Sequence, residues 1–340
     1  MSLEKHSTPP IVRQRRRGGA PVSDPARSVH SPVHKDAAAS TDSGKPPPAW
    51  FARAVAAPFE ERFVEVEGCP IHYLLWGQAG NPGLLLVHGG FAHAHWWDFI
   101  APVFADHYRV AAIDLSGMGD SGYRPKYSGE TYAKEVMAAS AGAGFGKAPV
   151  VVGHSFGGFV ALKSGALYGE KLSGVVIVDF PIRPPELQRD YEDRRPQIRP
   201  KEIYPNRKAA LERFRLIPAQ PCENAFILEH IAARSLAKVN GGWSWKFDDQ
   251  IFKGFELGNL SEDLPKVTCE LAFIYGERSA LFPREIVDYM SKLLRGRAPL
   301  IAIPKVHHHL FLDQPLVLVN ALQKVLNDWQ PRAATEVTSL

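Results

Sequence analysis

The stretch at 150–158, VVVGHSFGG, constrains this chain more than any other. Three valines and a glycine are typical of a short buried strand, and FVALKSGALYG after the turn has the composition of a helix. A strand, a Gly-x-Ser-x-Gly turn and a helix predict a strained turn that lifts the hydroxyl of Ser155 clear of a sheet. Gly153 and Gly157 fit because residues two before and two after the serine approach each other too closely for a Cβ. A glycine-rich phosphate-binding loop is the alternative, but it would have more glycines and no apolar residue directly after the serine.

Continuous apolar runs recur along the chain and alternate with helical segments. Such runs are typical of strands buried on both faces, and their alternation with helices predicts an α/β fold with a mostly parallel, doubly wound sheet. An earlier run alternates in period two and predicts an antiparallel hairpin at the sheet edge. The site is then expected outside the carboxyl ends of the strands. Besides the strand before Ser155, the expected strands are the hairpin from 62 to 77 and the runs 83–88, 108–114, 172–179, 270–275 and 299–303.

One interval of about ninety residues, between Asp179 and Leu271, contains no buried-strand run. It is too long for an ordinary crossover. Three segments within it have helical periodicity: 209–217, 225–239 and 248–258. We therefore expect a helical cap at 181–264, inserted after the sixth strand and lying over the serine, and an α/β core at 49–180 and 265–332.

The net charge of +4 resides in the first 48 residues. These carry eight Lys or Arg against four acids, which leaves the other 292 residues with 32 of each. The segment 1–48 is also rich in Pro and Ser and has almost no periodic apolar residues, a composition typical of disorder. We expect a disordered basic tail, no nucleic-acid partner, and full activity from a chain that begins near Ala49.

The cysteines and the hydropathy indicate the compartment. Cys69, Cys222 and Cys269 are odd in number and have no CxxC spacing, which argues against a disulfide framework and against a zinc site. No run approaches the roughly 18 apolar residues of a membrane helix. These observations favour a cytoplasmic protein without a membrane partner. The oligomeric state stays open, with a monomer or homodimer expected.

Four motifs occur in an order that resembles the α/β-hydrolase superfamily over roughly residues 60–330. The chain most resembles the epoxide-hydrolase and haloalkane-dehalogenase-like branch, because of the cap position and the segments DFPIRPP at 179–185 and YGERSALFP at 275–283. The four motifs are HGG at 88–90, D-x-x-G-x-G-x-S at 114–121, GHSFGG at 153–158 and HHHLFLDQP at 307–315.

The resemblance supplies a base for the serine. Serine is a poor nucleophile and needs an adjacent base, which is held by an acid. Members of this superfamily place the base just before the last helix, and that position falls on His308, with His307 and His309 as alternates. A metal site in this triplet is not expected, because adjacent side chains diverge. The resemblance implies no metal and no cofactor.

The expected acid departs from the common pattern. Most relatives carry Asp three residues after the glycine that ends the seventh strand, where this chain has Ser279. A neutral hydroxyl cannot balance the charge of an imidazolium. Asp179, at the end of the sixth strand, and Glu277 are the two candidates. We favour Asp179, because a strand end is a rigid mount and dehalogenase-like relatives use this position; a capping role for Asp179 is the alternative.

The resemblance also implies an oxyanion hole. Its backbone N–H donors would be those of Phe156, directly after the nucleophile, and Gly90, with Phe91 as a neighbouring candidate. Phe91, Trp97 and Trp243 are candidate substrate-binding residues, although packing in the core or the cap is an equal or better explanation of the two tryptophans.

The identity of the nucleophile narrows the set of reactions expected of this chain. Dehalogenases and epoxide hydrolases of this branch use Asp at the turn, and Ser155 cannot form their alkyl-enzyme ester. We expect a serine hydrolase that cleaves a carboxylic ester or lactone of a small to medium, mostly apolar molecule. A receptor that binds or slowly turns over a ligand is the alternative, kept open by Ser279; C–C bond or amide hydrolysis is another.

Overall fold

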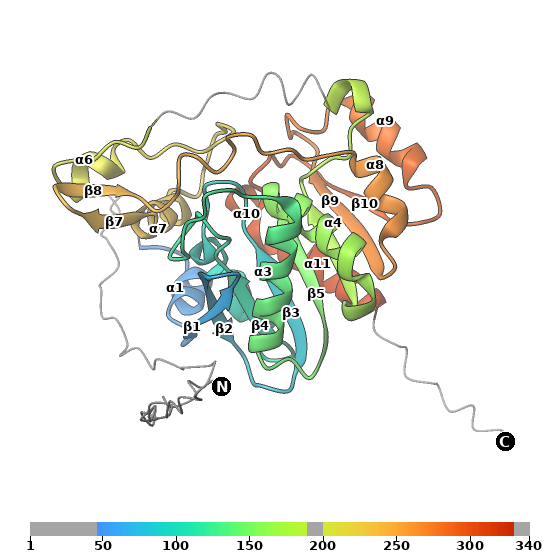
Figure 1. Ribbon diagram of the computed structural model, residues 1–340, viewed down its shortest axis with the longest axis horizontal. Coiled ribbons are helices and arrows are strands. Elements are labelled where there is room, and N and C mark those ends of the chain that lie inside the picture. Colours follow the sequence, from blue (N-terminus) through green and yellow to red (C-terminus); the bar gives the residue numbers. More distant parts are fainter. Residues whose placement is uncertain (1–45, 189–199, 330–340) are drawn as a thin grey trace, which may run out of the picture.

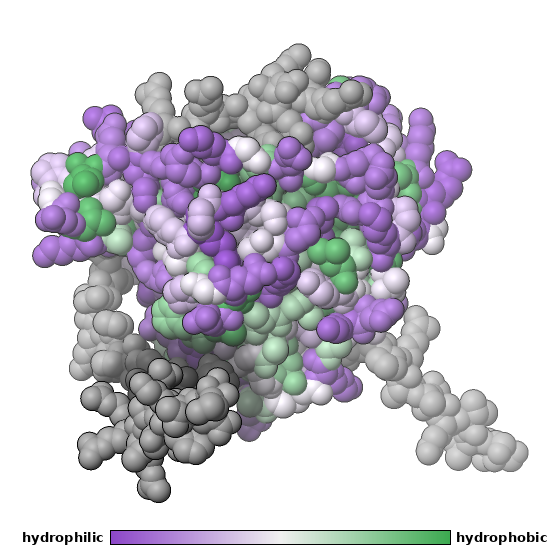
Figure 2. All heavy atoms as spheres, in the orientation of Figure 1, coloured by the Kyte–Doolittle hydropathy of each residue, from purple (hydrophilic) through white to green (hydrophobic). Residues whose placement is uncertain are grey.

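The computed structural model describes residues 46–188 and 200–329. The expected tail at 1–48 therefore lies almost entirely outside the described residues. Within them, no helix is long and apolar enough to cross a membrane. Figure 2 shows polar residues over much of one face, with apolar residues in small groups. The most exposed large apolar side chains come from separate segments, for example Ile203, Ile217 and Tyr123.

An eight-stranded sheet in the order β1-β2-β4-β3-β5-β6-β9-β10 forms the centre (Figure 1). β1 and β2 form an antiparallel hairpin at one edge, β2 is antiparallel to β4, and the other neighbours are parallel. This topology confirms the predicted fold class. The strands are β1 (Glu60–Val66), β2 (Cys69–Trp76), β3 (Pro82–Val87), β4 (Arg109–Ile113), β5 (Lys147–His154), β6 (Gly174–Val178), β9 (Glu270–Gly276) and β10 (Leu300–Ile303).

Helices cover both faces of this sheet, which explains the continuous apolar runs. Alternate side chains of β3 enter two different cores: Leu85 and Val87 join one, whereas Leu84 and Leu86 join the other. The first core lies beneath α3 (Gly129–Gly142), α4 (Phe156–Tyr168) and α9 (Arg284–Leu293). The second lies beneath α1 (Ala49–Val55), the 3₁₀ turn η1 (Ala94–Trp97), α2 (Ala101–Phe104), α10 (Leu310–Asp313) and α11 (Pro315–Asp328).

The interval between β6 and β9 is only partly helical. Its described elements include α6 (Arg207–Leu211), α7 (Ala225–Arg234), β7 (Leu236–Val239), β8 (Gly242–Trp245), α8 (Leu260–Asp263) and the 3₁₀ turn η3 (Leu264–Lys266). The helix expected at 225–239 ends at Arg234, because the chain reverses into the β7–β8 hairpin. Gly241, at the turn, has φ of 90°, a conformation that favours glycine.

The helix expected at 248–258 is wrong. Backbone groups of this region pair instead with the loop after β4: the amide of Gly119 donates to Lys246 O (2.8 Å) and that of Asp248 to Gly117 O (2.7 Å). The apolar residues that suggested a helix are buried in an irregular segment, with Ile251 and Phe255 in the first core. Tertiary pairing thus overrode the local pattern. The boundaries of a cap at 181–264 stay a prediction.

Candidate active site

Ser155 lies at the turn between β5 and α4. Its φ of 52° and ψ of −121° are strained for a residue with a side chain. A Cβ at Gly153 would lie 1.9 Å from Gly157 O, and one at Gly157 would lie 2.4 Å from Val87 O. Both glycines are therefore required, as the sequence suggested. The turn is held by bonds from the amide of Ser155 to Val178 O (2.8 Å) and from that of Gly158 to Ser155 O (2.7 Å).

His308 reaches this serine from the loop between β10 and α10. Its Nε2 lies 2.9 Å from Ser155 Oγ, and its Nδ1 lies 2.9 Å from Asp179 Oδ1. A carboxylate only accepts, so Nδ1 carries the proton and Nε2 is free to accept from the serine hydroxyl. His308 and Asp179 are almost fully buried, whereas Ser155 is partly exposed. The three side chains thus form a continuous hydrogen-bonded chain.

The two neighbouring histidines make other contacts. Nδ1 of His307 bonds to Asp313 (2.9 Å), away from the serine. His309 is buried, and its ring centre lies 4.8 Å from that of His308 and 5.7 Å from that of Trp96. The expectation that adjacent side chains of this triplet diverge is therefore wrong for His308 and His309, which both face inward.

Asp179, and not Glu277, contacts His308. Asp179 directly follows β6 and has φ of 51°. Its Oδ2 accepts from the amide of Gly276 (2.8 Å). Glu277 is exposed, and its carboxylate accepts from the amide of Lys305 (3.2 Å). The carboxylate of Glu277 thus contacts the segment after β10, whereas that of Asp179 contacts the imidazole. The geometry therefore favours Asp179 as the partner of His308.

Ser279 makes a contact that the sequence did not predict. Its neutral hydroxyl cannot serve as an acid, yet its Oγ donates to Asp179 Oδ1 at 2.5 Å. Its position three residues after Gly276, which ends β9, was the available signal. Two loops that follow neighbouring strands therefore meet at one carboxylate.

The loop after β3 lies beside the serine. A Cβ built on Gly89 would lie 3.3 Å from Ser155 Cβ, and one built on Gly90 would lie 3.8 Å from Phe156 Cβ. Phe156 is the first residue of α4, so its amide has no acceptor within the helix. Phe91 has φ of 60° and completes the turn of this loop. The expected oxyanion donors, Gly90 and Phe156, thus lie next to each other.

Aromatic side chains from the interval after β6 pack on this loop. The ring of Phe91 lies 4.9 Å from that of Phe247 and 5.1 Å from that of Phe252. The ring of Phe252 in turn lies 5.0 Å from that of Phe156. Phe91 therefore belongs to an aromatic cluster beside the turn, formed by Phe91, Phe156, Phe247 and Phe252.

The two tryptophans lie apart from this cluster. Trp97 is 1% exposed, belongs to the second core and packs against Phe311 at 5.5 Å, a position that fits packing and not substrate contact. Trp243 lies in β8, where its backbone pairs with that of Tyr204. Figure 1 shows β8 at one end of the molecule, well to the side of α4.

Buried histidines hold the loops around the serine. His154 Nε2 bonds to His308 O (2.9 Å), and burial holds the pKa of His154 well below its usual value, so the ring is neutral. His88 Nε2 accepts from the amide of Leu115 (3.1 Å), and burial lowers the pKa of His88 as well. Two neutral imidazoles thus fix the backbone on both sides of the site.

Two groups of side chains bring metal-type donors together. Donor atoms of His154, His308 and His309 lie within 4.8 Å of one another, as do those of the second group, His72, Asp114 and Asp120. Both nitrogens of His308 and Nε2 of His154 already take part in hydrogen bonds. Asp114 likewise accepts from the amides of Ala94 and Asp120. These contacts fit structural roles, and the expectation of no metal stays a prediction.

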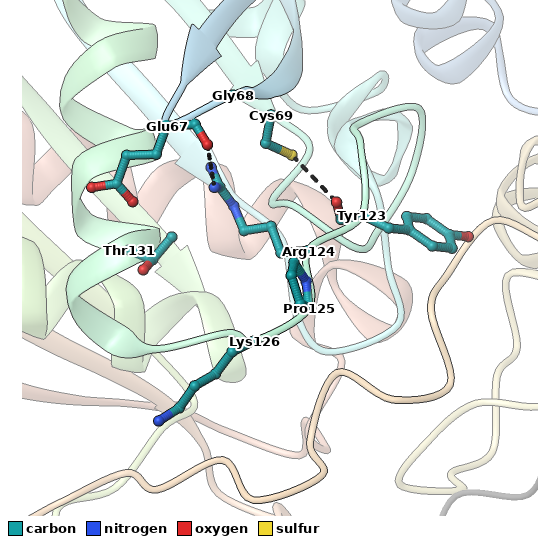
Figure 3. A pocket seen from close by; sticks show the side chains of 8 residues that line it. All are labelled: Glu67, Gly68, Cys69, Tyr123, Arg124, Pro125, Lys126 and Thr131. Carbon is teal, nitrogen blue, oxygen red and sulfur yellow. Dashed lines mark hydrogen bonds between the residues drawn. The ribbon is translucent and has the colours of Figure 1, made fainter.

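A pocket of about 240 Å³ on another part of the surface is lined by Glu67, Gly68, Cys69, Tyr123, Arg124, Pro125, Lys126 and Thr131 (Figure 3). The guanidinium of Arg124, which lines this pocket, already donates hydrogen bonds to Val66 O (2.6 Å) and to Glu135 Oε1 (2.9 Å). None of the residues predicted for the site lines this pocket. The three described cysteines are free thiols.

A family model described as the alpha/beta hydrolase family matches residues 84–322. This range contains the serine, the carboxylate and the histidine described above. The chain belongs to the α/β-hydrolase family.

Among relatives, this α/β-hydrolase is 26% identical over 279 residues to the esterase Rv0045c of Mycobacterium tuberculosis. The aligned region covers 77% of this chain and 88% of that esterase. It is 28% identical over 121 residues to human epoxide hydrolase 4, across 35% of the chain and 33% of that protein. A crystal structure of the Mycobacterium tuberculosis esterase superposes with a TM-score of 0.65 at 24% identity, covering 82% of this chain and 97% of that one. That structural likeness bears on the fold alone.

Proposed function

We propose that this hydrolase cleaves a carboxylic ester or lactone through an acyl-enzyme on Ser155. The observation that carries the proposal is the chain of contacts from Ser155 Oγ to His308 Nε2 (2.9 Å) and from His308 Nδ1 to Asp179 Oδ1 (2.9 Å). A base within hydrogen-bond reach of the hydroxyl, itself oriented by a carboxylate, is the arrangement that activates serine.

In the acylation step, Oγ attacks the carbonyl carbon while His308 Nε2 takes the hydroxyl proton. The carbonyl oxygen becomes an oxyanion, for which the amides of Gly90 and Phe156 are the proposed donors. Asp179 stabilises the imidazolium that forms. The tetrahedral intermediate then collapses, and His308 gives its proton to the departing alkoxide, so that an alcohol leaves and the acyl group stays on Ser155.

In the deacylation step, His308 removes a proton from water, and the resulting hydroxide attacks the acyl carbon. The second tetrahedral intermediate collapses with Ser155 Oγ as the leaving group, which recovers its proton from His308. The product is a carboxylic acid. For a lactone, the alcohol and the acid are parts of one molecule.

The aromatic cluster supports an apolar substrate of small to medium size. Phe91 and Phe252 lie beside the proposed oxyanion loop, and a Cβ on Gly90 would lie 3.2 Å from the ring of Phe252. An apolar acyl group that enters here would bury its surface against these rings.

The esterase name of the relative from Mycobacterium tuberculosis supports the same reaction class. The serine at the turn separates this chain from epoxide hydrolases that act through Asp. Ser279 kept the receptor alternative open, and the contact between Asp179 and His308 is an argument against that alternative.

A panel of p-nitrophenyl esters from acetate to octanoate, together with simple lactones, tests the proposal. We expect saturable turnover that Ser155→Ala reduces by at least three orders of magnitude. Ser164→Ala is the control, since Ser164 is a buried serine whose hydroxyl donates to Val160 O within α4. Binding of these compounds at one equivalent without repeated turnover would contradict the proposal and favour the receptor alternative.

A further inference from the structure

We propose that Ser279 is a positioning residue that orients the carboxylate of Asp179 toward His308; this inference rests on the proposed hydrolytic function. Ser279 Oγ lies 2.5 Å from Asp179 Oδ1, the same oxygen that His308 Nδ1 approaches at 2.9 Å. Ser279 is 5% exposed, so water competes little for this bond. The side chain of Ser279 cannot act as the acid itself, but it donates a hydrogen bond to Asp179, the proposed acid.

The direction of the Ser279 proton follows from its other contacts. The amide of Leu281 donates to Ser279 Oγ at 3.2 Å, which occupies the oxygen as an acceptor. A hydroxyl has a single proton, and the carboxylate can only accept. The Ser279 proton therefore points at Asp179 Oδ1. The bond is a charge-assisted one, of the stronger class.

Ser279 is itself held firmly. Its amide donates to Gly276 O (2.9 Å), and the amide of Phe282 donates to Ser279 O (3.1 Å), so the hydroxyl sits on a closed turn directly after β9. The same Gly276 donates its amide to Asp179 Oδ2 (2.8 Å). The turn at 276–279 therefore donates one hydrogen bond to each carboxylate oxygen of Asp179. These two bonds fix the plane of the carboxylate relative to the imidazole of His308.

Loss of the Ser279 hydroxyl has two consequences for the reaction. The carboxylate gains freedom to rotate away from His308, which reduces the fraction of molecules with an oriented base. The imidazolium that forms in acylation and deacylation also loses a fixed carboxylate partner. We therefore expect kcat to fall, while KM changes little.

The test compares Ser279→Ala and Ser279→Thr in full-length protein, with kcat and KM for p-nitrophenyl butyrate measured separately. We expect roughly a 10- to 100-fold loss of kcat in the alanine variant, the size of a lost hydrogen bond to a charged group, with KM within about threefold of the parent. The threonine variant keeps the hydroxyl, and its kcat stays within about threefold of the parent. Equal losses of kcat in the two variants, or a loss of thermal stability with kcat unchanged, would show a merely structural role and overturn the inference.

A double variant tests the inference if Ser279→Ala does not fold. Because Oγ of Ser279 and the imidazole of His308 contact the same oxygen of Asp179, the substitution Ser279→Asp would place a carboxylate beside His308. We expect the pair Asp179→Asn with Ser279→Asp to be at least tenfold faster than Asp179→Asn alone. A pair no faster than the single variant would count against Ser279 as part of this arrangement.

These measurements separate the inference from the function on which it rests. If Ser155→Ala and Asp179→Asn both retain parental rates, the proposed function fails. If both lose activity while Ser279→Ala matches its parent in kcat and in KM, only the role of Ser279 is refuted.

Discussion

At the scale of single residues, the assignment of the acid gives the clearest prediction. We expect Asp179→Asn to lower kcat by about 10³- to 10⁴-fold, because the amide no longer balances an imidazolium and favours the wrong tautomer of His308. Glu277→Gln is the matched control, since its exposed carboxylate contacts Lys305 and not the imidazole. Ester-hydrolysis kinetics of the two purified variants provide the comparison. Near-normal turnover in Asp179→Asn with a large loss in Glu277→Gln would reverse the assignment.

Phe252 gives a second prediction at this scale. Its ring lies against the loop of Gly90, so its removal would open space for a longer acyl group. We expect Phe252→Ala to raise the ratio of kcat/KM for p-nitrophenyl octanoate to that for butyrate by about tenfold. Trp243→Ala serves as the control, with an unchanged ratio, because Trp243 lies on the β7–β8 hairpin. An unchanged ratio in the Phe252 variant would remove Phe252 from the acyl site.

At the scale of elements, a buried ion pair joins β2 to the loop after β4. His72 Nδ1 lies 2.7 Å from Asp114 Oδ2. Burial opposes the charged ring, but the hydrogen bonds to Asp114 and Glu61 outweigh it and raise the pKa of His72 to about 9. A folded pKa above the usual 6.5 means that this stabilisation is complete below pH 6.5 and is lost as the pH rises through about 9.

We therefore expect His72→Asn to flatten the fall in stability between pH 6.5 and 9, a fall of order 3 kcal/mol in the parent protein. Asn keeps a donor for Asp114 but cannot titrate. Urea unfolding at several pH values measures the difference, with His107→Asn as an exposed control. Parallel curves for the parent and His72→Asn would show that the pair is not linked to stability.

The elements also show which parts of the structure could be predicted from the sequence. The buried strands and the turn at Ser155 were predictable, because apolar runs and glycine sterics are local. The segment at 248–258 was not, because the backbone of Asp248 pairs with that of Gly117, and the backbone of Lys246, just before the segment, pairs with that of Gly119, far away in sequence. The bond from Ser279 to Asp179 joins residues 100 apart, so the position of Ser279 after β9 was a signal in the sequence, but its partner was not. His308 was predicted by resemblance, since spacing alone left His307 and His309 open.

At the scale of the whole molecule, residues 46–329 contain both cores and all of the proposed site. We expect removal of residues 1–45 to leave kcat/KM and thermal stability unchanged. Further removal through residue 56 deletes α1, including Phe51, which is 4% exposed and packs against Phe226 at 4.8 Å. That deletion is expected to cost about 3–5 kcal/mol, as for loss of a buried Phe. Denaturant unfolding of the two shortened chains tests this; loss of activity on the first removal would contradict it.

Labelling with a fluorophosphonate tests most directly whether a hydroxyl made reactive by an imidazole lies at the centre of this molecule. The labelled protein is digested, and the modified peptide is identified by mass spectrometry. We expect one phosphonyl group per chain on Ser155, and no labelling of Ser155→Ala or His308→Ala on the same timescale. A modified residue other than Ser155, or equal labelling rates in the His308 variant, would contradict the proposed chemistry.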